Sequence, residues 1–106
     1  MGMNAKNVTQ GIKILNTVLG MNELYPSKWV NDRTFRENPY EGVIYGNDCK
    51  LYDGKFYGYE ELFAFKEGEL TSKQKETFEK LASKIGNTSF CKKYDKNTNF
   101  TILGWF

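Results

Sequence analysis

The strongest constraint on the fold is the segment of about 71–85, whose ends and apolar period both predict a helix. Thr71 and Gln74 stand three residues apart in the pattern of a capping box, in which each side chain satisfies a backbone N–H of the first turn. Gly86 is placed to end the helix, because glycine accepts the left-handed conformation found there. The stripe predicted to be buried is Phe78, Leu81, Ala82 and Ile85, opposite a side rich in Lys and Glu.

A second amphipathic helix is predicted over about 5–19. Asn4 or Asn7 can cap its start, and Gly20 suits the left-handed position just past its end. Gly11 inside it costs about 1 kcal/mol relative to Ala, so this helix must depend on tertiary packing. Its apolar stripe is Val8, Ile12, Leu15 and Leu19, with Ile14 and Val18 alongside.

Two antiparallel hairpins are predicted outside the helices. Asp53-Gly54 is a strong signal for a hairpin at about 49–59, because both positions of its tight turn need positive φ. A second hairpin is predicted at about 89–106, with 95–98 as its loop. The last strand is apolar on both faces, which is typical of a strand at the centre of a sheet. The segment 60–67 fits either a helical turn or a strand.

These elements predict an α+β protein, with an antiparallel sheet of about four to five strands packed with two helices. A length of 106 residues is near the usual size of one domain, so residues 1–106 are expected to form a single domain. Residues 21–42 hold both prolines and are interpreted as an irregular connection, with one short element near 28–31 pinned to the core by Trp29. Such a long connection is uncommon in a compact domain unless it has a function.

The absence of histidine excludes many enzyme classes. It removes Ser-His-Asp and Cys-His nucleophile systems and the common zinc sites. There is no glycine-rich phosphate loop either. A carboxylate-based enzyme is left open, with Glu60, its neighbour Glu61, and Asp48 as candidate acids. The sequence predicts no catalytic residue and no cofactor, and it favours a binding module over an enzyme.

One motif imitates a metal site. Asp95-x-Asn97-x-Asn99 resembles the start of a calcium-binding loop, but Phe100 occupies the position that needs glycine. A hairpin turn rich in Asp and Asn explains the same residues better, so no metal is expected.

The cellular setting follows from composition. No apolar run approaches 18 residues and no signal peptide is seen, so no membrane association and a cytoplasmic location are expected. Cys49 and Cys91 are then expected to be reduced and partly buried. The five-residue segments that begin at Cys49 and Cys91 are identical at four of five positions. Either a duplication or a coincidence can explain this match. Abundant Lys, Asn and Tyr with scarce Arg indicate an A+T-rich genome, which suggests a low-G+C bacterium or a phage or mobile element within it.

The first hairpin carries the candidate site. With Asp53-Gly54 as its turn, Leu51 opposes Phe56 on a face expected to belong to the core. The other face gathers cationic and aromatic residues, a combination that protein hot spots use. The alternative is a purely structural role, in which this face is exposed to solvent and its cross-strand pairs stabilise the hairpin by about 0.2–1 kcal/mol each. The candidate partner-binding residues are Lys50, Tyr52, Lys55 and Tyr57, with Tyr59 in line.

The function that these features predict is binding of a protein partner. An inhibitor encoded by a phage or mobile element to block a host protein fits the small size and the composition. Single-stranded nucleic acid is the alternative ligand of the same face. The net charge of +2 disfavours a dedicated duplex-DNA binder. An enzyme built on carboxylates is the third hypothesis.

Overall fold

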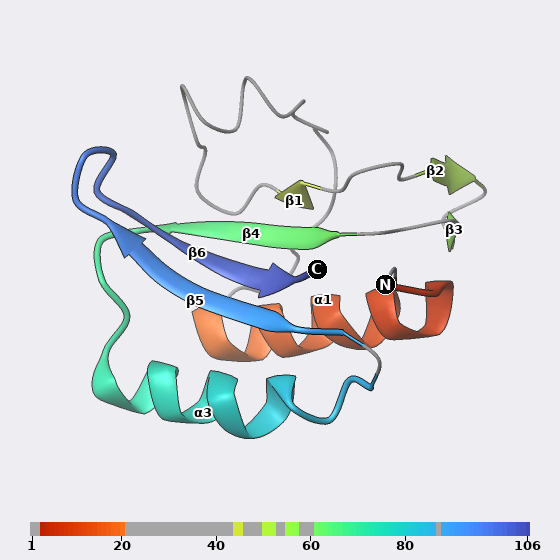
Figure 1. Ribbon diagram of the computed structural model, residues 1–106, viewed down its shortest axis with the longest axis horizontal. Coiled ribbons are helices and arrows are strands. Elements are labelled where there is room, and N and C mark those ends of the chain that lie inside the picture. The colour runs from red at the N-terminus through yellow and green to blue at the C-terminus, as the bar shows by residue number, and fades with distance from the viewer. Residues whose placement is uncertain (1–2, 21–43, 46–49, 53–54, 58–60, 87) are drawn as a thin grey trace.

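Two helices lie side by side against one face of an antiparallel sheet (Figure 1). The structure is a computed structural model, and it describes residues 3–20, 44–45, 50–52, 55–57, 61–86 and 88–106. The predicted α+β class is confirmed. The connection 21–42, with Trp29, lies outside the described residues.

Helix α1 (Ala5–Leu19) has the predicted bounds. Asn4 is the residue that caps it: its side-chain oxygen accepts from the Asn7 N–H at 2.8 Å. Gly20 ends the helix at φ 68, in the left-handed region, and its N–H donates to the Asn16 carbonyl. The predicted stripe is buried except for Ile12, which is half-buried and packs against the core.

Helix α3 (Ser72–Ala82) starts as predicted but ends about three residues early. Thr71 and Gln74 make both bonds of the capping box, at 3.1 and 2.9 Å. The prediction that Gly86 ends the helix is wrong, because Gly86 does not have a positive φ. The physical reason is the Ala82 carbonyl, which accepts from the indole Nε1 of Trp105 at 3.2 Å and from the Ile85 N–H. Tighter i→i+3 bonds then carry the chain away from the helix.

The sheet consists mainly of three six-residue strands in the order β4-β6-β5. The segment that fitted either a helix or a strand forms β4, and the last strand is central, as predicted. A further strand of two residues, β1, pairs with β4, and β2 with β3 forms a separate two-stranded sheet. The predicted count of four to five strands is not confirmed, because only three of the described strands are long and the hairpin predicted to join their sheet is separate from it. The strands are β1 Ile44–Tyr45, β2 Lys50–Tyr52, β3 Lys55–Tyr57, β4 Leu62–Glu67, β5 Phe90–Asp95 and β6 Phe100–Trp105.

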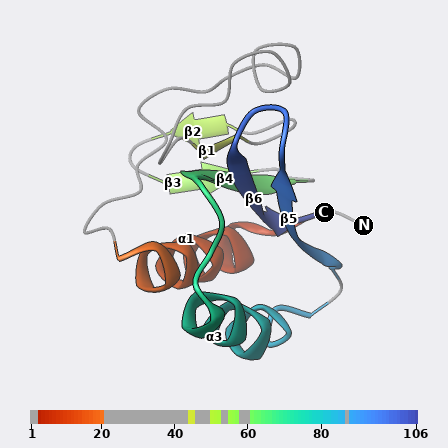
Figure 2. The same ribbon diagram turned by 90° about the vertical axis from the view of Figure 1, so that its left-hand side faces the viewer.

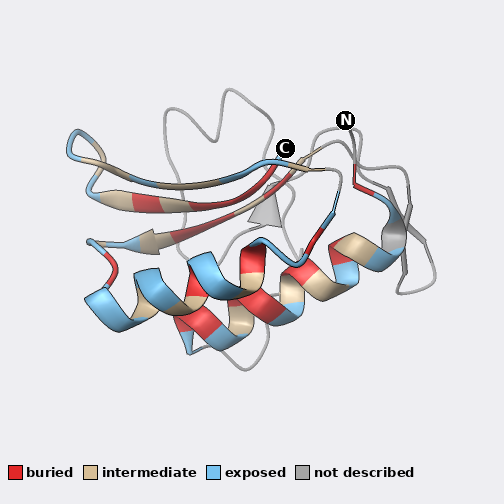
Figure 3. Cartoon of the chain, turned by 60° about the horizontal axis from the view of Figure 1, so that its bottom comes forward, coloured by how far each residue is buried: buried red, intermediate tan, exposed pale blue. Residues whose placement is uncertain are grey.

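The main core lies between the sheet and the helices. Figure 3 shows the buried positions of α1 and α3 turned inward and the exposed ones outward. Trp105 is fully buried at its centre, with its ring centroid 5.5 Å from that of Phe78. The other face of the sheet carries a second cluster around Phe65, which is also fully buried. Partly buried Phe63, Phe100 and Ile102 pack against Phe65.

Two glycines permit the close approach of neighbouring elements. A Cβ at Gly11 would lie 2.9 Å from Leu62 Cδ2 and 3.1 Å from Trp105 Cζ3. Glycine at this position therefore lets α1 pack closely against the sheet. A Cβ at Gly104 would lie 2.0 Å from the carbonyl oxygen of Leu62 and 2.8 Å from the Cα of Phe63. Gly104 therefore allows β6 to approach β4 where Phe63 lies directly opposite.

Candidate functional site

The backbone of the predicted site forms the hairpin β2–β3. Lys50 pairs with Tyr57, Leu51 with Phe56, and Tyr52 with Lys55, which is the register predicted from the sequence. Because successive residues of a strand alternate between its faces, this register assigns the Lys–Tyr pairs to one side and the Leu–Phe pair to the other. We call the side of Lys50, Tyr52, Lys55 and Tyr57 the hairpin face. The turn Asp53-Gly54 and the fifth candidate, Tyr59, lie outside the described residues.

The hairpin lies beside the domain core and is separate from the main sheet. Strand β3 contacts α1, and Figure 1 shows both short strands near the N-terminal end of that helix. A two-stranded hairpin is marginally stable by itself in water, so contact with the rest of the domain is what its stability requires.

Only one of the candidate acids of a carboxylate enzyme, Glu61, is among the described residues. Asp48 and Glu60 lie outside them, and Glu61 is half-buried at the start of β4. The described part of the chain holds no cluster of three or more Cys, Asp or Glu that could bind a metal ion. None of its helices is both long and apolar enough to cross a membrane.

The calcium-like motif is a hairpin turn, as predicted. The carboxylate of Asp95 accepts from the Asn97 N–H at 3.0 Å and from the Thr98 hydroxyl at 3.2 Å. Asn99 takes a left-handed conformation, φ 59, and its side-chain oxygen accepts from the Tyr94 hydroxyl at 2.5 Å. These oxygens are bound within the turn, which accounts for the Asp-Asn pattern without a metal.

Cys91 is a free, partly buried thiol, as expected; Cys49 is not among the described residues. Burial raises the pKa of the Cys91 thiol to about 11, while the nearby positive charge of Lys93 lowers it. The thiol therefore stays protonated at neutral pH. A protonated thiol is a poor nucleophile, which makes Cys91 a structural residue.

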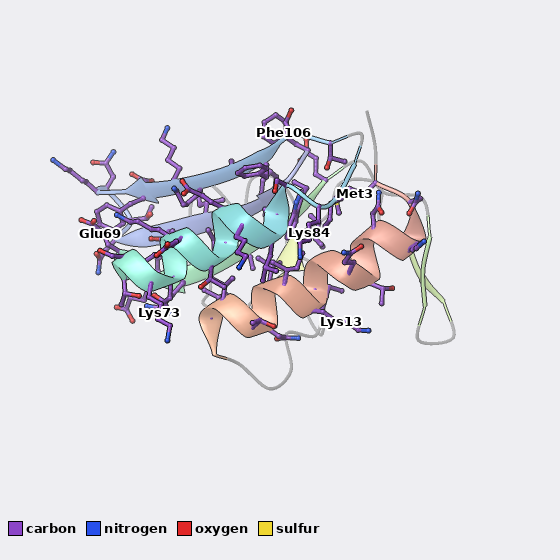
Figure 4. All side chains as sticks on the ribbon, turned by 90° about the horizontal axis from the view of Figure 1, so that it is seen from below. Met3, Lys13, Glu69, Lys73, Lys84 and Phe106 are labelled. Carbon is purple, nitrogen blue, oxygen red and sulfur yellow. The ribbon has the colours of Figure 1, made fainter. Side chains whose placement is uncertain are left out.

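A basic surface along β5 is the feature that the sequence interpretation missed. Lys92 forms an ion pair with Glu79 of α3, and Lys93 is exposed. A shallow surface pocket between α3 and the sheet is lined by Glu69, Leu70, Lys75, Lys92, Tyr94 and Thr101. Figure 4 shows the side of the domain where α3 covers this part of the sheet, with Glu69 and Lys73 near the start of the helix. The sequence signal for this basic surface was the pair Lys92-Lys93 within a predicted strand. Only the strand order shows that this strand lies at an edge of the sheet.

Comparison with protein-family models, with curated proteins and with solved structures gives no match.

Proposed function

We propose that this chain is a protein-binding module that contacts its partner through the hairpin face, with Tyr59 extending it. The observation that supports the proposal is the register of β2–β3, which assigns two lysines and two tyrosines to one side of the hairpin. Tyrosine is enriched in binding hot spots because it combines a large apolar ring with a hydroxyl that can form hydrogen bonds.

The position of the hairpin gives the two sides different roles in this proposal. Since β3 lies against α1, one side of the hairpin has to supply the contact with the domain. Leu51 and Phe56 are the apolar pair suited to that contact, because their burial releases water from apolar surface. The hairpin face is then the side left for a partner.

The setting that we propose is inhibition of a host protein inside a bacterial cell, by a product of a phage or mobile element. The small size of the domain and its A+T-biased composition support this setting. An inhibitor needs only a surface that competes for a partner, so it requires no catalytic group of its own.

The test compares two triple variants of the full chain. Lys50→Ser/Tyr52→Ser/Tyr57→Ser removes the hairpin face, and Lys13→Ser/Lys73→Ser/Lys80→Ser removes three exposed side chains from the helices. The unmodified chain is immobilised and used to capture proteins from a lysate of the source organism, and the captured protein is then purified and titrated against the unmodified chain and each variant. We expect the hairpin variant to lose at least about tenfold in affinity, or 1.4 kcal/mol, and the control to bind normally. Equal binding by both variants refutes the assignment.

The alternative ligand, single-stranded nucleic acid, is tested with a labelled oligonucleotide. If this ligand is the true one, the affinity falls steeply with salt and Tyr52→Ala weakens it, because a base stacked on an aromatic ring contributes about 1–3 kcal/mol. That result would replace the protein-binding proposal. An oligonucleotide that does not bind removes the alternative.

A further inference from the structure

Strand β5 forms the outer edge of the main sheet. It pairs with β6 on one side, and the part of the chain that the structure describes places no strand on its other side. Figure 2 shows β5 at the border of the sheet, away from β1 and β2. At six residues it is as long as β4 and β6, and longer than the short strands that usually close an edge.

The hydrogen bonds identify which backbone groups of this edge face outward. Ser89 and Phe106 exchange two bonds, each N–H donating to the other carbonyl, at 3.1 and 2.9 Å. In an antiparallel pair such hydrogen-bonded positions alternate with positions whose N–H and C=O point away from the partner. The outward positions of β5 are therefore Phe90, Lys92 and Tyr94. They offer three N–H and three C=O groups to an added strand.

The charge of this edge favours an acidic strand. Lys92 and Lys93 lie within β5, Lys96 follows it, and Lys75 lines the same pocket as Lys92. Glu69 also lines this pocket, but two other acids beside the lysines are already engaged. Glu79 pairs with Lys92, and Asp95 accepts two bonds within its own turn.

One end of the edge also presents an apolar surface. The ring of Phe90 packs edge-on against Phe78, with centroids 5.8 Å apart, yet Phe90 remains 38% exposed. Phe106, whose backbone pairs with Ser89 at the same end, is 48% exposed. An apolar residue of an added strand would cover Phe90 and so contribute hydrophobic energy beyond the backbone hydrogen bonds.

We propose that β5 is a second binding site, which accepts an extended acidic segment of a partner protein as an additional strand of the sheet. Backbone hydrogen bonds at Phe90, Lys92 and Tyr94 supply the pairing, and the lysines select acidic residues. A second copy of this chain is the wrong occupant, because pairing β5 with β5 would bring the lysines of the two copies together. The site is separate from the hairpin face, so each proposal can fail without the other.

The probe is a short blocked peptide with glutamate at the positions opposite Lys92 and Lys93 and valine elsewhere. Its control carries lysine in place of each glutamate. We expect the acidic peptide to bind at least about threefold more tightly, with the difference shrinking as salt is raised. Equal affinity for the two peptides overturns the proposal.

Two variant pairs test the backbone and the charge separately. Lys92→Pro removes an outward N–H without touching the bonds to β6, and Lys92→Ala removes the same side chain but keeps that N–H. We expect Lys92→Pro to bind at least about threefold more weakly than Lys92→Ala, the effect of one lost hydrogen bond. Lys93→Glu is expected to weaken binding likewise, whereas Lys13→Glu on the exposed side of α1 is not. Undiminished binding by a folded Lys92→Pro or by Lys93→Glu refutes the site.

Amide hydrogen exchange locates the added strand directly. In the free protein the outward amides of Lys92 and Tyr94 should exchange faster than those of Cys91 and Lys93, which bond to β6. The acidic peptide should slow exchange at Lys92 and Tyr94. If Lys92→Pro does not fold, this measurement and Lys93→Glu decide the question. Unchanged exchange with bound peptide, or self-association of the free chain through β5, overturns the proposal.

Discussion

Replacing Gly104 with alanine should be among the most destabilising single-methyl changes in this chain. Gly104 and Phe63 are opposite each other in a pair that is not hydrogen-bonded, where antiparallel strands approach most closely. The new Cβ would lie 2.0 Å from the carbonyl oxygen of Leu62 and 2.8 Å from the Cα of Phe63. Both are backbone atoms, so no change of rotamer relieves the contact, and β4 and β6 must separate. Overpacking costs typically about 1–3 kcal/mol, and we expect the upper end, about 3 kcal/mol.

The assay is thermal and urea unfolding followed by circular dichroism. For a domain of this size, 1 kcal/mol shifts Tm by about 4–8 °C, so Gly104→Ala should lower Tm by at least about 12 °C. The matched control is Gly86→Ala, whose Cβ meets nothing within 4 Å and whose φ is not in the left-handed region. That change should be neutral or stabilise by up to about 1 kcal/mol. If Gly104→Ala unfolds within about 2 °C of Gly86→Ala, the close approach of β4 and β6 is wrong.

Three further substitutions test the core, the helix cap and the buried thiol. Trp105→Phe removes one of the two donors to the Ala82 carbonyl and replaces the buried indole with a smaller ring, so it should cost about 1–3 kcal/mol in urea unfolding. Thr71→Ala should cost about 1 kcal/mol and lower the helical signal. In a Cys49→Ser background, the rate of alkylation of Cys91 should rise with pH around a midpoint of about 11, instead of the 9.0 of an ordinary thiol. Because the folded state raises this pKa, its contribution to stability is complete below pH 9.0 and is lost as the pH rises to about 11.

Local features of the fold could be predicted because a few neighbouring residues decide them. The cap at Asn4, the left-handed Gly20 and the capping box at Thr71 each act within one turn of backbone, and all three have the predicted geometry. The register of β2–β3 was equally accessible, since a two-residue loop leaves only one way to pair the strands. Four of the five candidate residues were thereby assigned to one side of the hairpin.

Features set by residues distant in the chain could not be predicted in this way. Helix α3 ends early because the indole of Trp105, 23 residues away, bonds to its last carbonyl. The segment that became β4 has a pattern compatible with a helix, and only pairing with β6 determines its state. Gly104 gave no signal at all, because its importance comes from Phe63 on the neighbouring strand. The edge position of β5 depends in the same way on the strand order.

The site proposed at β5 follows from one property of the sheet, which is that its described strands are not all paired on both sides. Among the described residues, β1 adds two residues to β4 on one side of the sheet, whereas β5 is the outermost strand on the other side and has six residues. An open edge of that length invites pairing with any extended chain, and lysines are the side chains that commonly prevent it. Lysines repel a second copy and attract an acidic strand, so on this proposal the same residues would oppose self-association and select the partner. The hairpin face combines lysine with tyrosine, and there the ring adds contact area that does not depend on the charge of the partner. Salt should therefore weaken binding at β5 more than binding at the hairpin face.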